Sequence, residues 1–160
     1  MKKFLPWIGL LSRLILGGVL LAAGLLKYQH LDKSQMAVRA YEMLPIALAN
    51  LIGIILPFLE IAVGVLLIIG AAVRISAIVG GVLMGAFMIG IAQAWARGLS
   101  IDCGCFGGGG AVEPGQTKYL QEILRDAGLA FLAAYLIRYP VTKFSVDKKP
   151  ADSTSQKDVA

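Results

Sequence analysis

The sequence predicts an all-α integral membrane protein, a four-helix bundle whose helices each cross the bilayer. Of its 160 residues, 58% are hydrophobic and 16% charged, and the mean hydropathy is +0.75, which is too apolar for an ordinary soluble domain. The apolar residues fall into four runs. Three are close to the roughly 20 residues that cross a hydrocarbon core, and the second is longer, enough for a tilted span. The runs cover about 7–26, 44–72, 75–96 and 119–137.

The net charge of +5 lies mostly in short segments at the ends of these runs. Basic residues in such positions favour lipid headgroups as their partner and argue against nucleic acid. The lipid bilayer is therefore the first expected partner, and a second copy of the chain is another candidate. Residues 1–140 form the predicted membrane domain, and residues 141–160 are predicted to be a polar, disordered tail because they contain too few apolar residues to fold.

The first run, about 7–26, follows a basic start and ends with the small residues Ala22, Ala23 and Gly24. A cleaved signal peptide is the alternative to a spanning helix, because it has the same pattern. The length of the run, the arginine Arg13 within it and the further spans that follow favour a helix that stays in the membrane.

The polar segment 27–43 is predicted to be an interfacial loop or a short surface helix, since aromatic residues lie beside charges at both of its ends. It holds the single histidine of the chain, His30. A solvated histidine at the interface is the simpler interpretation, and a proton carrier or metal ligand is the alternative.

The second run, 44–72, contains Pro57, which we expect to kink the helix, and the acidic residue Glu60. An ionisable side chain in the membrane needs a partner, such as Arg13, or a water-filled cavity. Glu60 could relay protons, sense charge at a bound cofactor, or form a structural ion pair between helices.

The third run, 75–96, follows a tight turn at 71–74 and contains Gly81 and Gly85 at a spacing that lets helices pack closely. The fourth run, 119–137, carries the adjacent charges Arg125 and Asp126 about two turns from its start. If that run spans the membrane, neighbouring groups must satisfy this charged pair.

Between the third and fourth runs lies the glycine-rich stretch 97–110, with the only two cysteines, Cys103 and Cys105. A disulfide between them would close a tiny, strained ring, and strain makes a disulfide easier to reduce. This pair predicts thiol–disulfide exchange, and the glycines around it leave room for a partner chain. We predict that Cys103 attacks or is attacked in a mixed disulfide and that Cys105 resolves it, an order that the sequence alone leaves open.

Two charged residues near the cysteines have opposite expected effects. Arg97 would favour a thiolate, whereas Asp102 would disfavour it or act as a base. A metal site would need further ligands, which only His30, Asp102 or a partner chain could offer, so no metal is expected. Lipidation of a cysteine and a structural loop with inert cysteines are the remaining alternatives.

The distribution of basic residues predicts a topology. Four spans would put the basic residues of the first three positions, of 74 and of 138–149 on one side, which the positive-inside tendency assigns to the cytoplasm. Both termini would then be cytoplasmic, and Cys103 and Cys105 would lie outside a bacterial inner membrane, where disulfides persist.

Several strings resemble the MauE branch of the DoxX-like membrane proteins. They are the pattern from Lys27 through Leu44-Pro45, Leu56-Pro57-Phe58-Leu59-Glu60, Arg97-Gly98, Cys103-Gly104-Cys105-Phe106-Gly107 and Arg125-Asp126. The CGCFG string followed by the RD pair is the most specific. The resemblance implies a four-helix membrane bundle that acts in extracytoplasmic thiol redox chemistry. MauE is associated with maturation of the disulfide-rich small subunit of methylamine dehydrogenase, and DoxX relatives with thiol or sulfur oxidation linked to quinone.

By that resemblance, Cys103 and Cys105 would be the catalytic pair, with Glu60, Arg97, Arg125 and Asp126 as supporting polar residues. The expected function is electron or disulfide exchange between an extracytoplasmic thiol or thioredoxin-like partner protein and a membrane acceptor such as quinone, the candidate cofactor. The alternative is a non-catalytic assembly or solute-transport protein, with the intramembrane charges along its path.

Overall fold

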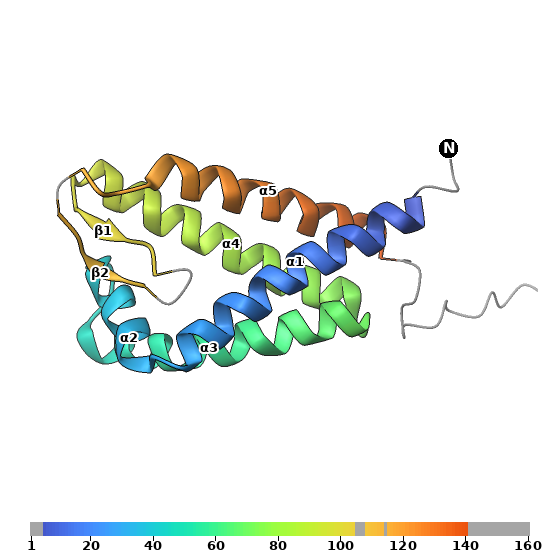
Figure 1. Ribbon diagram of the computed structural model, residues 1–160, viewed down its shortest axis with the longest axis horizontal. Helices are drawn as coiled ribbons and strands as arrows, with labels where there is room; N and C mark the ends of the chain where they lie inside the picture. Colours follow the sequence, from blue (N-terminus) through green and yellow to red (C-terminus); the bar gives the residue numbers. More distant parts are fainter. Residues whose placement is uncertain (1–4, 105–107, 114, 141–160) are drawn as a thin grey trace, which may run out of the picture.

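The computed structural model describes residues 5–104, 108–113 and 115–140. Within these ranges it contains five helices and one two-stranded sheet (Figure 1), so the predicted all-α class is confirmed. In chain order the elements are α1 (Leu5–Tyr28), α2 (Leu31–Ala40), α3 (Ile46–Ile69), α4 (Val73–Ala96), β1 (Ile101–Asp102), β2 (Gly110–Ala111) and α5 (Tyr119–Arg138). The predicted tail, 141–160, lies outside the described residues.

Two helix pairs make up the bundle. α1 packs chiefly on α3 and α4 on α5, and contacts between α1 and α5 and between α3 and α4 join the pairs. The first pair is very close: a Cβ atom on Gly64 would lie 2.7 Å from the backbone nitrogen of Leu21. Small residues allow such an approach, which lets helices associate in lipid. Gly81 similarly faces Ala133 on α5, whereas a Cβ on Gly85 would meet nothing within 4 Å.

The protein is a membrane protein whose surface is largely apolar. Among the described residues, three helices are long and apolar enough to cross a bilayer, at Trp7–Tyr28, Ile46–Ile69 and Val73–Ala96. Large apolar side chains are exposed along them, including Leu11, Ile55 and Ile89, as expected for contact with lipid. The predicted fourth span corresponds to α5, which lies along α4 (Figure 1) but is more polar at its start.

The connection between α3 and α4 is shorter than predicted. Gly70 ends α3 in the left-handed conformation, at φ 79°, and α4 begins at Val73. Arg74, which was expected in the turn, therefore lies in the first turn of α4. α3 continues through Pro57, whose missing N–H costs one helical hydrogen bond but does not end the helix.

A short helix and the hairpin cover one end of the bundle, opposite the N-terminus of α1 (Figure 1). In the segment 27–43, predicted as a loop or short helix, the first two residues end α1 and Leu31–Ala40 form α2, which packs on α3. The hydroxyl of Ser34 donates a hydrogen bond to the carbonyl of Gly53 at 2.7 Å, and a Cβ on Gly53 would lie 2.6 Å from the Cα of Gln35. α2 is therefore fixed to the bundle. The loop that joins β1 to β2, here called the cysteine loop, packs against it.

Candidate redox site

The cysteine stretch forms a hairpin at the covered end of the bundle. β1 and β2 pair antiparallel, with Ile101 opposite Ala111 and Asp102 opposite Gly110. Cys103 follows β1 directly, so the hairpin delivers it to the space between α2 and α5. Cys105, the second predicted catalytic residue, lies outside the described residues.

Cys103 is buried and oxidised. Its residue is 7% exposed and its sulfur is in a disulfide, and no described cysteine is a free thiol. The carbonyl of Cys103 accepts a hydrogen bond from the Tyr41 hydroxyl at 3.1 Å. Burial and the nearby carboxylates of Glu122, Asp126 and Asp102 raise the pKa of Tyr41, so the phenol stays protonated and keeps this bond.

Two glycines of the loop serve its own packing. Gly104 has φ +68° and Gly109 φ +130°, and a Cβ on either would lie 2.4 Å from the Cβ of Ala37 on α2. Both positions therefore exclude other residues for conformational and steric reasons. Their role differs from the expected one of leaving room for a partner chain, since these two glycines face the protein.

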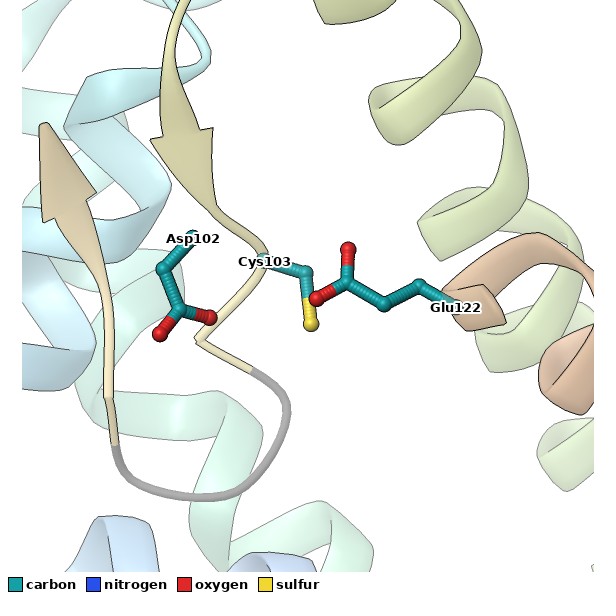
Figure 2. A group of neighbouring side chains, drawn as sticks. All are labelled: Asp102, Cys103 and Glu122. Carbon is teal, nitrogen blue, oxygen red and sulfur yellow. The ribbon is translucent and has the colours of Figure 1, made fainter. Parts of the chain in front are cut away.

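Two carboxylates flank the sulfur of Cys103 (Figure 2). One oxygen each of Asp102 and Glu122 and the Cys103 sulfur all lie within 4.8 Å of one another. Asp102 also accepts a hydrogen bond from the backbone N–H of Gly104 at 3.1 Å, and Glu122 accepts one from the backbone N–H of Cys103. The carboxylate predicted from sequence is thus joined by a second one, from the first turn of α5.

Glu122 was missed by the sequence analysis. Its signal was its position, four residues before Asp126 and therefore on the same helix face. The three side chains Asp102, Cys103 and Glu122 are close enough to share a metal ion if the sulfur were a thiolate. Because the sulfur is in a disulfide, the group described here is a disulfide with two acidic neighbours.

Arg97 anchors the site from the side of α4. It pairs with Glu42 at 2.8 Å and donates to the backbone carbonyl of Tyr41 at 3.3 Å, where Gln93 also donates at 2.8 Å. Tyr41 in turn holds Cys103. Arg97 therefore reaches the cysteine loop through Tyr41, and its carboxylate partner is Glu42.

Glu60 pairs with Lys27, not with Arg13. The ammonium of Lys27 lies 2.6 Å from the Glu60 carboxylate, with both side chains almost completely buried. Arg13 is about four turns, or about 21 Å, away from Lys27 along α1, so it lies at a different depth. Lys27 was expected in the polar segment after the first run, but it is a buried residue in the last turn of α1.

The second predicted charged pair lies close to the first. Arg125 contacts its neighbour Asp126 at 2.8 Å, and Asp126 is buried. Glu60, Arg125 and Asp126 line one small cavity with apolar side chains from α1, α4 and α5, among them Phe87. The structure thus brings three of the predicted supporting residues together and adds Lys27 as a fourth member.

The hydroxyl of Tyr119 fastens the hairpin to α5: it donates to the carbonyl of Leu99 and accepts from the N–H of Ile101. Tyr119→Phe should leave that buried N–H without a partner, at a cost of about 1–3 kcal/mol. We expect faster alkylation of Cys103 after reduction, measured by mass spectrometry. Tyr28→Phe, at an exposed tyrosine in α1, is the control. Equal alkylation rates in both variants would contradict this role of Tyr119.

The fold and the site define a helical membrane protein with a cysteine loop fixed over one end of its bundle. Comparison with known proteins gives its family: the model for "Methylamine utilisation protein MauE" matches residues 5–139, so the chain belongs to the MauE family. The resemblance in the sequence is thereby confirmed.

Two curated relatives share this similarity. The chain is 34% identical to the methylamine utilization protein MauE of Methylorubrum extorquens over 118 residues, 72% of this chain and 60% of the relative. It is 32% identical to that of Paracoccus denitrificans over 98 residues, 61% of this chain and 53% of the relative. The matches thus span between half and two thirds of each relative's length. No solved structure matches the chain.

Proposed function

We propose that the protein is a membrane-embedded thiol–disulfide redox protein that uses Cys103 and Cys105. The observation that carries this proposal is the environment of Cys103: an oxidised sulfur at the end of the bundle, with the carboxylates of Asp102 and Glu122 within reach. Thiol–disulfide exchange needs a proton acceptor near the thiol and a stable position for the sulfur. The hairpin and α5 supply both.

The burial of Cys103 supports a division of roles. A partner's thiol cannot reach the sulfur of a residue that is only 7% exposed without movement of the loop. We therefore reverse the order predicted from the sequence: Cys103 takes the resolving role, and Cys105 forms the mixed disulfide with an extracytoplasmic thiol or thioredoxin-like protein. A membrane acceptor such as quinone then receives the electrons.

The proposed topology has four spans. α5 completes the bundle by lying along α4. Its acidic residue Asp126 is buried, and the partly exposed Arg125 pairs with it. With four spans, both termini are cytoplasmic and the hairpin faces the outside of a bacterial inner membrane, where a disulfide persists. This assignment follows the distribution of basic residues.

The alternative, a solute path along the intramembrane charges, has less support. The cavity between Glu60 and Asp126 has room for about one water molecule. It is therefore too small to pass a solute larger than water in this conformation.

Cysteine substitutions test the proposal. Cys103→Ser and Cys105→Ser should each abolish dithiol-dependent quinone reduction by the protein in lipid nanodiscs, because one cysteine cannot form the disulfide. Cys103→Ser should also accumulate a mixed disulfide with the partner through Cys105, which thiol-trapping mass spectrometry detects. Ser100→Ala, in the same stretch, is the control. Full activity in both cysteine variants would refute the redox function.

A further inference from the structure

Three carboxylates extend from the redox site into the bundle, and each has an unsatisfied oxygen. Glu122 Oε2, Asp126 Oδ2 and Glu60 Oε2 are buried and have no hydrogen-bond partner among the described residues. A buried acceptor without a partner is costly, so most are satisfied by protein or water. Three such oxygens in series indicate that a proton or a water molecule binds at these carboxylates.

The three groups are placed in sequence. The Glu122 carboxylate lies beside the Cys103 sulfur (Figure 2). Asp126 is one helical turn further along α5, on the same face. Asp126 and Glu60, from α5 and α3, both line the cavity that has room for about one water. A water has two donors, one for each free oxygen of these carboxylates.

The surrounding charges balance the two inner carboxylates. Lys27 pairs with Glu60 and lies over the ring of Phe87, 5.0 Å from its centroid, and Arg125 pairs with Asp126. The cluster of these four charged residues is neutral overall. One added proton gives it a single positive charge, so a proton can be held there without building up a large charge in the membrane interior.

We propose that Glu122, Asp126 and Glu60 form a proton route from Cys103 into the bundle, with a bound water between Asp126 and Glu60. The proposal rests on the redox function given above. Oxidation of two thiols by a quinone yields one disulfide and one quinol, and transfers two electrons and two protons. Glu122 takes each proton in turn from the thiol site and returns to the carboxylate when Asp126 receives it. The water and Glu60 carry the proton on towards the quinone.

The test uses the full chain in lipid nanodiscs, with dithiothreitol as electron donor and a short-chain ubiquinone as acceptor. Asp126→Asn and Glu60→Gln should slow quinol formation by about 100-fold, the scale of a lost proton-transfer group. Reduction of the disulfide by dithiothreitol alone should keep its wild-type rate in both. Glu122→Gln should slow both reactions, because it removes the group beside the sulfur.

Controls separate the route from the redox function itself. Glu113→Gln, an exposed acid close to the loop, should behave as wild type. Wild-type quinol formation in Asp126→Asn and Glu60→Gln would overturn the route and leave the redox function standing. If dithiothreitol reduces the disulfide of the wild-type protein but no quinol forms, that result would overturn both quinone as the acceptor and the route.

A further variant and a spectroscopic measurement test the route even if Asp126→Asn or Glu60→Gln does not fold. Lys27→Met/Glu60→Leu removes the whole ion pair and is expected to fold, because an apolar pair often replaces a buried ion pair without loss. Although this double variant folds, its quinol formation should remain slow. Quinol formation at the wild-type rate would overturn the route. Infrared difference spectra between oxidised and reduced wild-type protein should show a change in a carboxyl C=O stretch that is lost in Glu60→Gln. The same spectra in both proteins would remove Glu60 from the route.

Discussion

Lys27→Met is expected to lower the free energy of unfolding by about 3–5 kcal/mol, because it leaves the Glu60 carboxylate buried without its cation. The two side chains are only 3% and 1% exposed, so water cannot replace the lost partner. Lys27 also joins α1 to α3, since its partner lies in the middle of α3. The measurement is thermal and denaturant unfolding in detergent, followed by circular dichroism.

Two further variants calibrate this result. Lys27→Met/Glu60→Leu should recover most of the lost stability, since it removes both charges together. Glu42→Gln weakens the exposed pair with Arg97, whose side chains are 44% and 60% exposed, and should cost no more than about 1 kcal/mol. A loss in Lys27→Met as small as that in Glu42→Gln would show that the buried pair does not stabilise the bundle.

Gly104→Ala is expected to displace the cysteine loop from α2. The new Cβ would lie 2.4 Å from the Cβ of Ala37, and the backbone at φ +68° disfavours alanine by about 1–2 kcal/mol. We expect the loop to open and reduced Cys103 to react faster with a maleimide. Quinone reduction should fall, because the sulfur leaves the Glu122 carboxylate.

The clash offers a direct rescue. Ala37→Gly removes the opposing methyl group, so Ala37→Gly/Gly104→Ala should regain part of the slow labelling and of the activity. Ala37→Gly alone should cost only about 1 kcal/mol, the propensity cost of glycine in a helix. Gly115→Ala is the matched control, since Gly115 also has positive φ, +91°, but no neighbour within 4 Å. Labelling of Gly104→Ala no faster than that of Gly115→Ala would contradict the packing of the loop on α2.

Sequence predicted the membrane bundle because apolar runs of membrane-spanning length leave few alternatives. The runs also carried the charges Glu60, Arg125 and Asp126, since each interrupts an otherwise apolar helix. Lys27 and Glu122, the charges nearest the ends of runs, were harder to interpret. Lys27 follows an apolar run, where a lysine usually extends to the interface, and only the packing of α1 on α3 turns it inward.

Contacts between distant segments could not be predicted from a single sequence. The Glu60 partner depends on the depth at which α1 and α3 cross, and spacing along the chain does not fix that depth. Glu122 looked like an ordinary acid in the first turn of a helix, where the helix dipole favours it. Its place beside Cys103 depends on how the hairpin folds back onto α5.

The hairpin also connects the two halves of the bundle. Helices in lipid associate without the hydrophobic effect that drives soluble proteins together, so contacts outside the bilayer contribute more to their cohesion. The cysteine loop rests on α2, which is packed on α3, and Tyr119 fastens the same hairpin to α5. The loop therefore links the α1–α3 pair to the α4–α5 pair. A change in its disulfide would reach both pairs at once.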